Sequence, residues 1–89
     1  MITVVITHEV KAYSEWRKGY DADEGNRNKA GAKISGVYTS VDNPNMVTVI
    51  GEFSSVEAAQ GFMSSPELKK AMEGAGVIGV PEVKILNKA

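Results

Sequence analysis

Residues 33–53, KISGVYTSVDNPNMVTVIGEF, contain two strand-like segments separated by a turn. The segments at 33–40 and 46–53 are rich in Ile, Val, Thr and aromatic residues, a composition typical of β-strands. Between them, VDNPN at 41–45 supplies the Asp, Asn and Pro residues that favour turns. Because this connection is short, the sequence predicts an antiparallel hairpin in the middle of the chain.

A helical pattern lies on each side of this hairpin. Upstream, Ser14 is a favourable N-cap and Gly31 a favourable C-terminal stop, while Gly25 predicts a kink or an end. Three aromatic residues there share one helical face: Tyr13, Trp16 and Tyr20.

Downstream of the hairpin, Ser54 and Glu57 fit a capping box. The segment Ser65-Pro66-Glu67 then restarts a helix, because it places serine at the N-cap and proline at the first helical position. Gly74 marks the approximate end of this second helical region.

The chain begins and ends with two further strand-like segments, ITVVITHEV at 2–10 and PEVKILNK at 81–88. The order is therefore β-α-β-β-α-β, which is the ferredoxin-like arrangement of the α+β class. We predict one domain over residues 1–89, with a four-stranded antiparallel sheet and two helices on one face of it.

The predicted strands carry apolar side chains on both faces. Val5 opposes its neighbours Val4 and Ile6, and Ile50 opposes Val49. Two helices can cover only one face, and each apolar side chain left in water forfeits roughly 1.5–3 kcal/mol of burial energy. We therefore predict a homodimer through the helix-free sheet faces; the alternative is a monomer with an apolar sheet surface.

Composition excludes several classes of function. The net charge of −1 gives no general attraction to nucleic acid or to an anionic membrane, and no apolar run is long enough to span a bilayer. The N-terminal segment has no features of a signal peptide, so we expect a cytoplasmic protein. With no cysteine and one histidine, no metal site and no resident cofactor are predicted.

Three segments and one further residue resemble a known family. WRKGYD at 16–21, VDNPN at 41–45, EFSSVEAAQGFMSSPELKKAM at 52–72 and Arg27 are similar to small proteins of the dimeric α+β barrel superfamily, nearest to its antibiotic-biosynthesis-monooxygenase-like and uncharacterised members. The resemblance covers essentially the whole chain. It implies dimerisation through the sheet and ligand binding between the sheet and the helices. Members include cofactor-free monooxygenases, lactone isomerases, polyketide cyclases and haem-degrading enzymes.

Six residues are expected to wall such a cavity: His8 as a catalytic candidate, and Trp16, Tyr20, Tyr38, Phe62 and Met63 as ligand-binding candidates. A histidine near a strand end could act as a general base or bind haem iron. The structural alternative is a hydrogen-bonded core histidine among core aromatic residues. Arg27 could bind a carboxylate or pair with Asp23 or Glu24 on the helix surface.

Three hypotheses of function stay open, and the sequence does not decide whether the protein is an enzyme. The first is a cofactor-free monooxygenase-like, isomerase-like or cyclase-like enzyme that acts on a flat apolar small molecule. The second is a non-catalytic metabolite-binding or stress-related barrel dimer. The third is haem binding through His8. A cavity below roughly 300 Å³ would favour the second hypothesis over the first.

The segment GAGVIG at 74–79 matches the glycine fingerprint of dinucleotide-binding turns. That fingerprint follows a strand and opens a helix, so that a phosphate meets the helix N-terminus. Here the predicted order is reversed. We therefore interpret GAGVIG as a helix stop followed by a crossover into the last strand.

Overall fold

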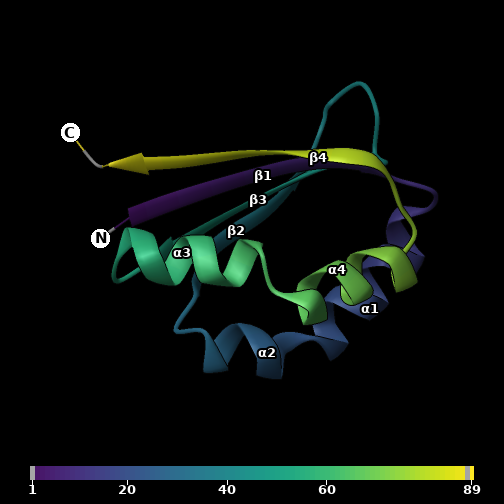
Figure 1. Ribbon diagram of the computed structural model, residues 1–89. Helices are drawn as coiled ribbons and strands as arrows, with labels where there is room; N and C mark the ends of the chain where they lie inside the picture. Colours follow the sequence, from purple (N-terminus) through teal and green to yellow (C-terminus); the bar gives the residue numbers. More distant parts are fainter. Residues whose placement is uncertain (1, 88) are drawn as a thin grey trace.

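The computed structural model describes residues 2–87 and 89, which form a sheet layer and a helix layer (Figure 1). The strands are β1 (Ile2–Val10), β2 (Lys33–Thr39), β3 (Met46–Phe53) and β4 (Val77–Asn87). The helices are α1 (Tyr13–Ala22), α2 (Glu24–Lys29), α3 (Val56–Met63) and α4 (Pro66–Gly74). All strand pairs are antiparallel and the strand order is β2-β3-β1-β4. This is the ferredoxin-like order, so the predicted fold class is confirmed.

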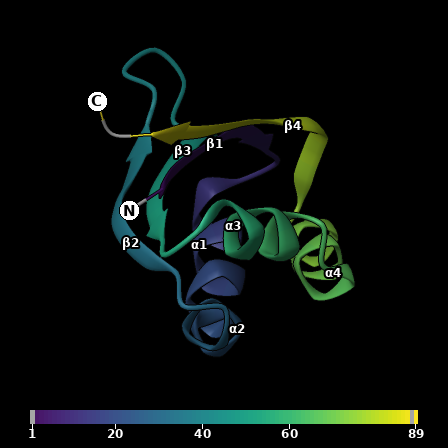
Figure 2. The same ribbon diagram turned by 60° about the vertical axis from the view of Figure 1, so that its left-hand side comes forward.

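All four helices lie on one face of the sheet, but each predicted helix is divided into two (Figures 1 and 2). The first division is at Asp23, between α1 and α2, rather than at Gly25. The second lies before Pro66, where Ser65 Oγ accepts a hydrogen bond from the Leu68 backbone N–H at 3.1 Å as predicted. Gly31 has a φ of 75° just after α2 and is the predicted stop.

Two predicted N-caps are wrong. Helix α3 is capped by Ser55, whose Oγ accepts from the Ala58 N–H at 3.1 Å, and not by Ser54. Helix α1 begins before Ser14, and the Asn45 side chain accepts from the Tyr13 backbone N–H at 3.0 Å. The first turn of α1 is thus satisfied by a residue of the β2–β3 turn, which no local pattern in the helix could reveal.

Replacing Asn45 with alanine is expected to lower the free energy of unfolding by about 1 kcal/mol, because a helix N–H loses its side-chain acceptor. Ser14→Ala is the matched control and should change the free energy of unfolding by less than about 0.5 kcal/mol. Chemical denaturation of both variants checks this pair. A larger loss for Ser14→Ala than for Asn45→Ala would contradict the assignment of the cap.

The strand register places the two faces of the sheet as predicted in β1 and β3. Val4, His8 and Val47 point toward the helices and are buried. Val5 and Ile50 are directly opposite each other and point to the helix-free face, where they are half-buried. On the same face, Leu86 of β4 is 44% exposed and Tyr38 of β2 is 54% exposed. The outer face of the sheet therefore combines apolar residues with threonines and charged residues.

Strand β4 begins four residues earlier than the predicted segment at 81–88, of which residue 88 lies outside the described residues. The GAGVIG segment ends α4 and enters this strand, as interpreted from the sequence. Gly76 has a φ of 83° at the helix stop, and Gly79 has a φ of 72° where β4 loses register with β1. No helix among residues 2–87 and 89 combines the length and the apolar character needed to cross a bilayer.

The core beneath the sheet is divided into two clusters. One contains Val10, Trp16, Val47 and Val49, and the other contains Val4, Phe53 and Ala59. Gly51 lies on the helix-facing side of β3 between them and contributes no side chain. The two clusters therefore leave room at the centre of the layer between sheet and helices.

Candidate ligand-binding site

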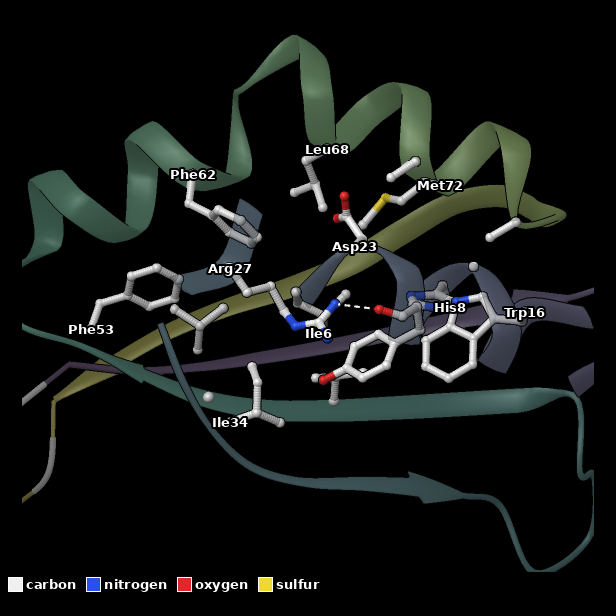
Figure 3. A pocket seen from close by; sticks show the side chains of 17 residues that line it. Ile6, His8, Trp16, Asp23, Arg27, Ile34, Phe53, Phe62, Leu68 and Met72 are labelled. Atoms are coloured by element: carbon white, nitrogen blue, oxygen red, sulfur yellow. Dashed lines mark hydrogen bonds between the residues drawn. The ribbon is translucent and has the colours of Figure 1, made fainter. Parts of the chain in front are cut away.

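A cavity of about 70 Å³ occupies this space between the two core clusters (Figure 3). Strands β1, β2 and β3 supply Ile6, His8, Ile34 and Phe53 on the sheet side. Phe62 of α3 and Leu68 and Met72 of α4 close it on the opposite side. Leu68 and Met72 are partly exposed on this side, since α4 has no fully buried residue. The lining is mainly apolar, as is typical of small-molecule sites.

His8 is the most unusual polar group in this lining. Its side chain is 5% exposed, yet neither Nδ1 nor Nε2 has a hydrogen-bond partner among the described residues. The imidazole ring lies 5.5 Å from the Trp16 ring. Burial lowers the pKa of His8 below the ordinary value of 6.5. Among the described residues His8 therefore lacks the hydrogen-bonded neighbour that a core histidine would need, and its two ring nitrogens have unused hydrogen-bonding capacity.

The lowered pKa of His8 makes stability depend on pH in a defined window. Near and below about pH 6.5 the unfolded chain binds more of a proton at His8 than the folded chain does, because burial lowers the pKa of the folded state. The free energy of unfolding should therefore fall as the pH is lowered from about 7.5 to 5.5, with a slope of up to about 1.4 kcal/mol per pH unit.

His8 is the only histidine, so His8→Phe should remove this slope between about pH 5.5 and 7.5. Denaturant titrations of both proteins at several pH values provide the measurement. An equal slope in the wild type and the variant would show that His8 is not buried in its neutral form.

One side of the cavity is lined by a stacked series of side chains, which are Trp16, Tyr20 and Arg27. The rings of Trp16 and Tyr20 are stacked at 4.9 Å, and the Arg27 guanidinium lies 3.7 Å from the centroid of the Tyr20 ring. Arg27 is 9% exposed, and its Nη1 donates a hydrogen bond to the Tyr20 carbonyl oxygen at 2.7 Å. Burial raises the pKa of Tyr20, so its phenol stays protonated at neutral pH.

The structure brings four of the six predicted residues to the cavity: His8, Trp16, Tyr20 and Phe62. Met63 instead packs against the cluster of Val4, Phe53 and Ala59. Tyr38 pairs with Thr48 and lies on the outer face of the sheet, so the prediction that it walls a cavity beside the helices is wrong. An irregularity between Ile34 and Gly36 shifts the alternation in β2, which turns Val37 rather than Tyr38 inward.

Arg27 is the residue that the sequence interpretation undervalued. The surface ion pair with Asp23 or Glu24 is not formed, since no carboxylate among the described residues lies within 4.0 Å of the guanidinium. Arg27 follows Tyr20 by seven residues, but the break at Asp23 separates α1 from α2, so helical spacing alone does not place the guanidinium beside the Tyr20 ring. Within residues 2–87 and 89, no cluster of three or more His, Asp or Glu side chains could hold a metal ion.

Known protein families and curated proteins give no match to this sequence. Solved structures do match its fold. A protein of Bordetella bronchiseptica, provisionally named an antibiotic biosynthesis monooxygenase, superimposes with a TM-score of 0.83 at 16% identity, covering 99% of this chain and 96% of that one. SnoaB, a cofactor-independent oxygenase from Streptomyces nogalater determined as a single-residue variant, gives a TM-score of 0.76 at 14% identity over 98% and 91% of the two chains.

A conserved protein from Methanosarcina mazei is similar at 22% identity, with a TM-score of 0.76 over 99% of this chain and 92% of that one. At these identities the likeness establishes the fold alone. The chain has the ferredoxin-like α+β fold of antibiotic biosynthesis monooxygenase structures, and the resemblance inferred from the sequence is confirmed at that level.

Proposed function

We propose that the protein binds a small, flat, largely apolar compound in the central cavity, and that His8 makes the polar contact to it. The unpartnered nitrogens of His8 are the observation that carries this proposal. Burying a polar group without a hydrogen bond costs about 1–3 kcal/mol. A ligand can accept a hydrogen bond from one ring nitrogen of His8 or donate one to the other. Either bond offsets the free-energy cost of burying that nitrogen, and it does so only in the complex.

The proposed chemistry is oxygenation without a cofactor, as in the oxygenase whose fold this chain shares. Neutral His8 takes a proton from a CH₂ group beside a carbonyl, and the resulting carbanion adds dioxygen to form a peroxide. The peroxide takes up the proton, loses its second C–H proton and expels water as the O–O bond breaks. One CH₂ group and one O₂ thus become one C=O group and one H₂O. The same carbanion could instead be protonated at another carbon or attack a carbonyl, as isomerases and cyclases require.

The size of the cavity supports a second candidate, binding without catalysis. Its volume of about 70 Å³ is well below the roughly 300–1,000 Å³ of typical ligand sites, so the cavity has room for about one ring. Two or three fused rings would enter only if Leu68 and Met72 moved with α4, the helix without buried residues. Haem binding through His8 is not proposed, because the macrocycle is far larger than this cavity.

A homodimer through the outer face of the sheet completes the proposal. Val5 and Ile50 face each other at the centre of that face, and Leu86 and Tyr38 extend the apolar area toward its two edges. A second copy that covers these residues would remove them from water, as the hydrophobic effect favours.

Oxygen consumption with 2-indanone and anthrone tests the catalytic proposal. These flat ketones have two and three rings, and both carry CH₂ hydrogens acidified by a carbonyl group. The proposal expects uptake above the buffer rate, with one C=O and one water formed for each O₂. Binding of either compound without uptake would favour the non-catalytic candidate. Failure of both to bind at millimolar concentration would contradict the proposed site.

A further inference from the structure

We infer that the ligand of this cavity carries an anionic oxygen, a carboxylate or enolate, which Arg27 recognises beside the apolar ring. This inference rests on the proposed binding site and adds the charge class of its ligand. It starts from a guanidinium that is 9% exposed without a carboxylate within 4.0 Å among the described residues. A charge so placed is costly unless it is paired in some state of the protein.

The contacts of Arg27 fix the position of its guanidinium but leave its positive charge without a negatively charged partner. One N–H donates to the Tyr20 carbonyl oxygen at 2.7 Å, and the Tyr20 ring lies 3.7 Å from the guanidinium carbon. A guanidinium has five N–H donors, and the structure gives the others no acceptor among residues 2–87 and 89. The side chain is therefore fixed in place while most of its donors remain available.

Arg27 also lies at a boundary between two kinds of surface. It lines the apolar cavity, to which Asp23 contributes the one carboxylate, and it lines a polar surface cleft that contains cations and carboxylates. The cleft residues with charged side chains besides Arg27 are Arg17, Lys33, Asp21 and Glu24. Figure 3 shows its side chain directed to the middle of the cavity, between the Phe53–Phe62 end and the His8–Trp16 end. A ligand whose ring occupies the apolar side can thus place an acidic oxygen against the guanidinium, where charge-assisted hydrogen bonds form.

Arg17 provides a matched comparison within the same region. Its guanidinium lies 5.4 Å from the Tyr20 ring centroid, but its Nε is paired with Asp21 at 3.1 Å and its side chain is 41% exposed. The positive charge of Arg17 is therefore already paired with Asp21, and water screens it. Comparing the two arginines separates a specific contact from a general attraction of anions.

Benzoate and benzyl alcohol, titrated calorimetrically at neutral pH, are the probes. We expect the wild type to bind benzoate about tenfold or more tightly than benzyl alcohol, since a charged hydrogen bond contributes that much. Arg27→Gln should abolish the preference for benzoate over benzyl alcohol, and Arg17→Gln should preserve it.

The wild-type comparison needs no variant, so a misfolded Arg27→Gln does not weaken the test. Equal affinities of the wild type for the two probes would overturn the anion inference while leaving the apolar site intact. An equal loss of benzoate affinity in both arginine variants would also overturn the inference. It would indicate a general electrostatic attraction of anions and not a specific contact with Arg27. If neither probe binds, both the inference and the proposed site are wrong.

Discussion

Replacing His8 with phenylalanine is expected to stabilise the fold and to slow the proposed oxygenation strongly. The substitution keeps a flat ring beside Trp16 and removes two buried nitrogens that have no partner. The free energy of unfolding should rise by about 1–3 kcal/mol at neutral pH, the cost of unsatisfied polar groups. Oxygen uptake should fall by about 10²- to 10⁴-fold, the usual contribution of a general base. A gain in stability with a loss of activity is typical of functional residues.

Two further variants isolate the role of His8. His8→Gln keeps a polar side chain without a base, so it should lose activity without the gain in stability. Met63→Leu changes a predicted site residue that the structure places in the core cluster, and it should alter turnover little. A His8→Phe protein that is less stable than the wild type, or that retains turnover, would contradict the account of His8.

Replacing Ile50 with lysine is expected to dissociate the proposed homodimer into monomers. Ile50 lies opposite Val5 at the centre of the helix-free face, so a second copy would bury an unpaired ammonium group there. A buried charge without a partner costs about 3 kcal/mol or more, which corresponds to at least a hundredfold weaker association. Sedimentation velocity at micromolar concentration measures the change.

Val41→Lys is the matched control, because Val41 is a fully exposed valine of the β2–β3 turn, outside the sheet. It adds the same charge and should leave the dimer intact. Circular dichroism should show that both variants keep the fold. A wild-type protein that is monomeric at tens of micromolar would contradict the proposed homodimer.

The order of strands and helices could be predicted because local signals agree with the tertiary structure. The turn VDNPN, the restart at Ser65-Pro66 and the positive φ of Gly31 and Gly76 each depend on residues near in sequence. The cap of α1 could not be predicted, since its acceptor, Asn45, is 32 residues away from Tyr13. Contacts between distant segments leave no periodic pattern in either one.

The candidate site was predicted only in part for similar reasons. Helical spacing placed Trp16 and Tyr20 together, and strand alternation placed His8 with Val4 and Ile6. Tyr38 does not reach the cavity, because the irregularity in β2 shifts the alternation after Ile34 and turns this side chain outward. The burial of Arg27 depends on the packing of α2 against Tyr20, which the sequence alone does not fix.

The central claim is that His8 contacts the ligand of the cavity. The most direct test is the two-bond ¹H–¹⁵N spectrum of the single imidazole, recorded with and without saturating 2-indanone. At least one ring nitrogen of His8 is expected to shift on binding, because it gains a hydrogen bond that it lacks in the free protein. A spectrum unchanged at a concentration where 2-indanone is bound would contradict it.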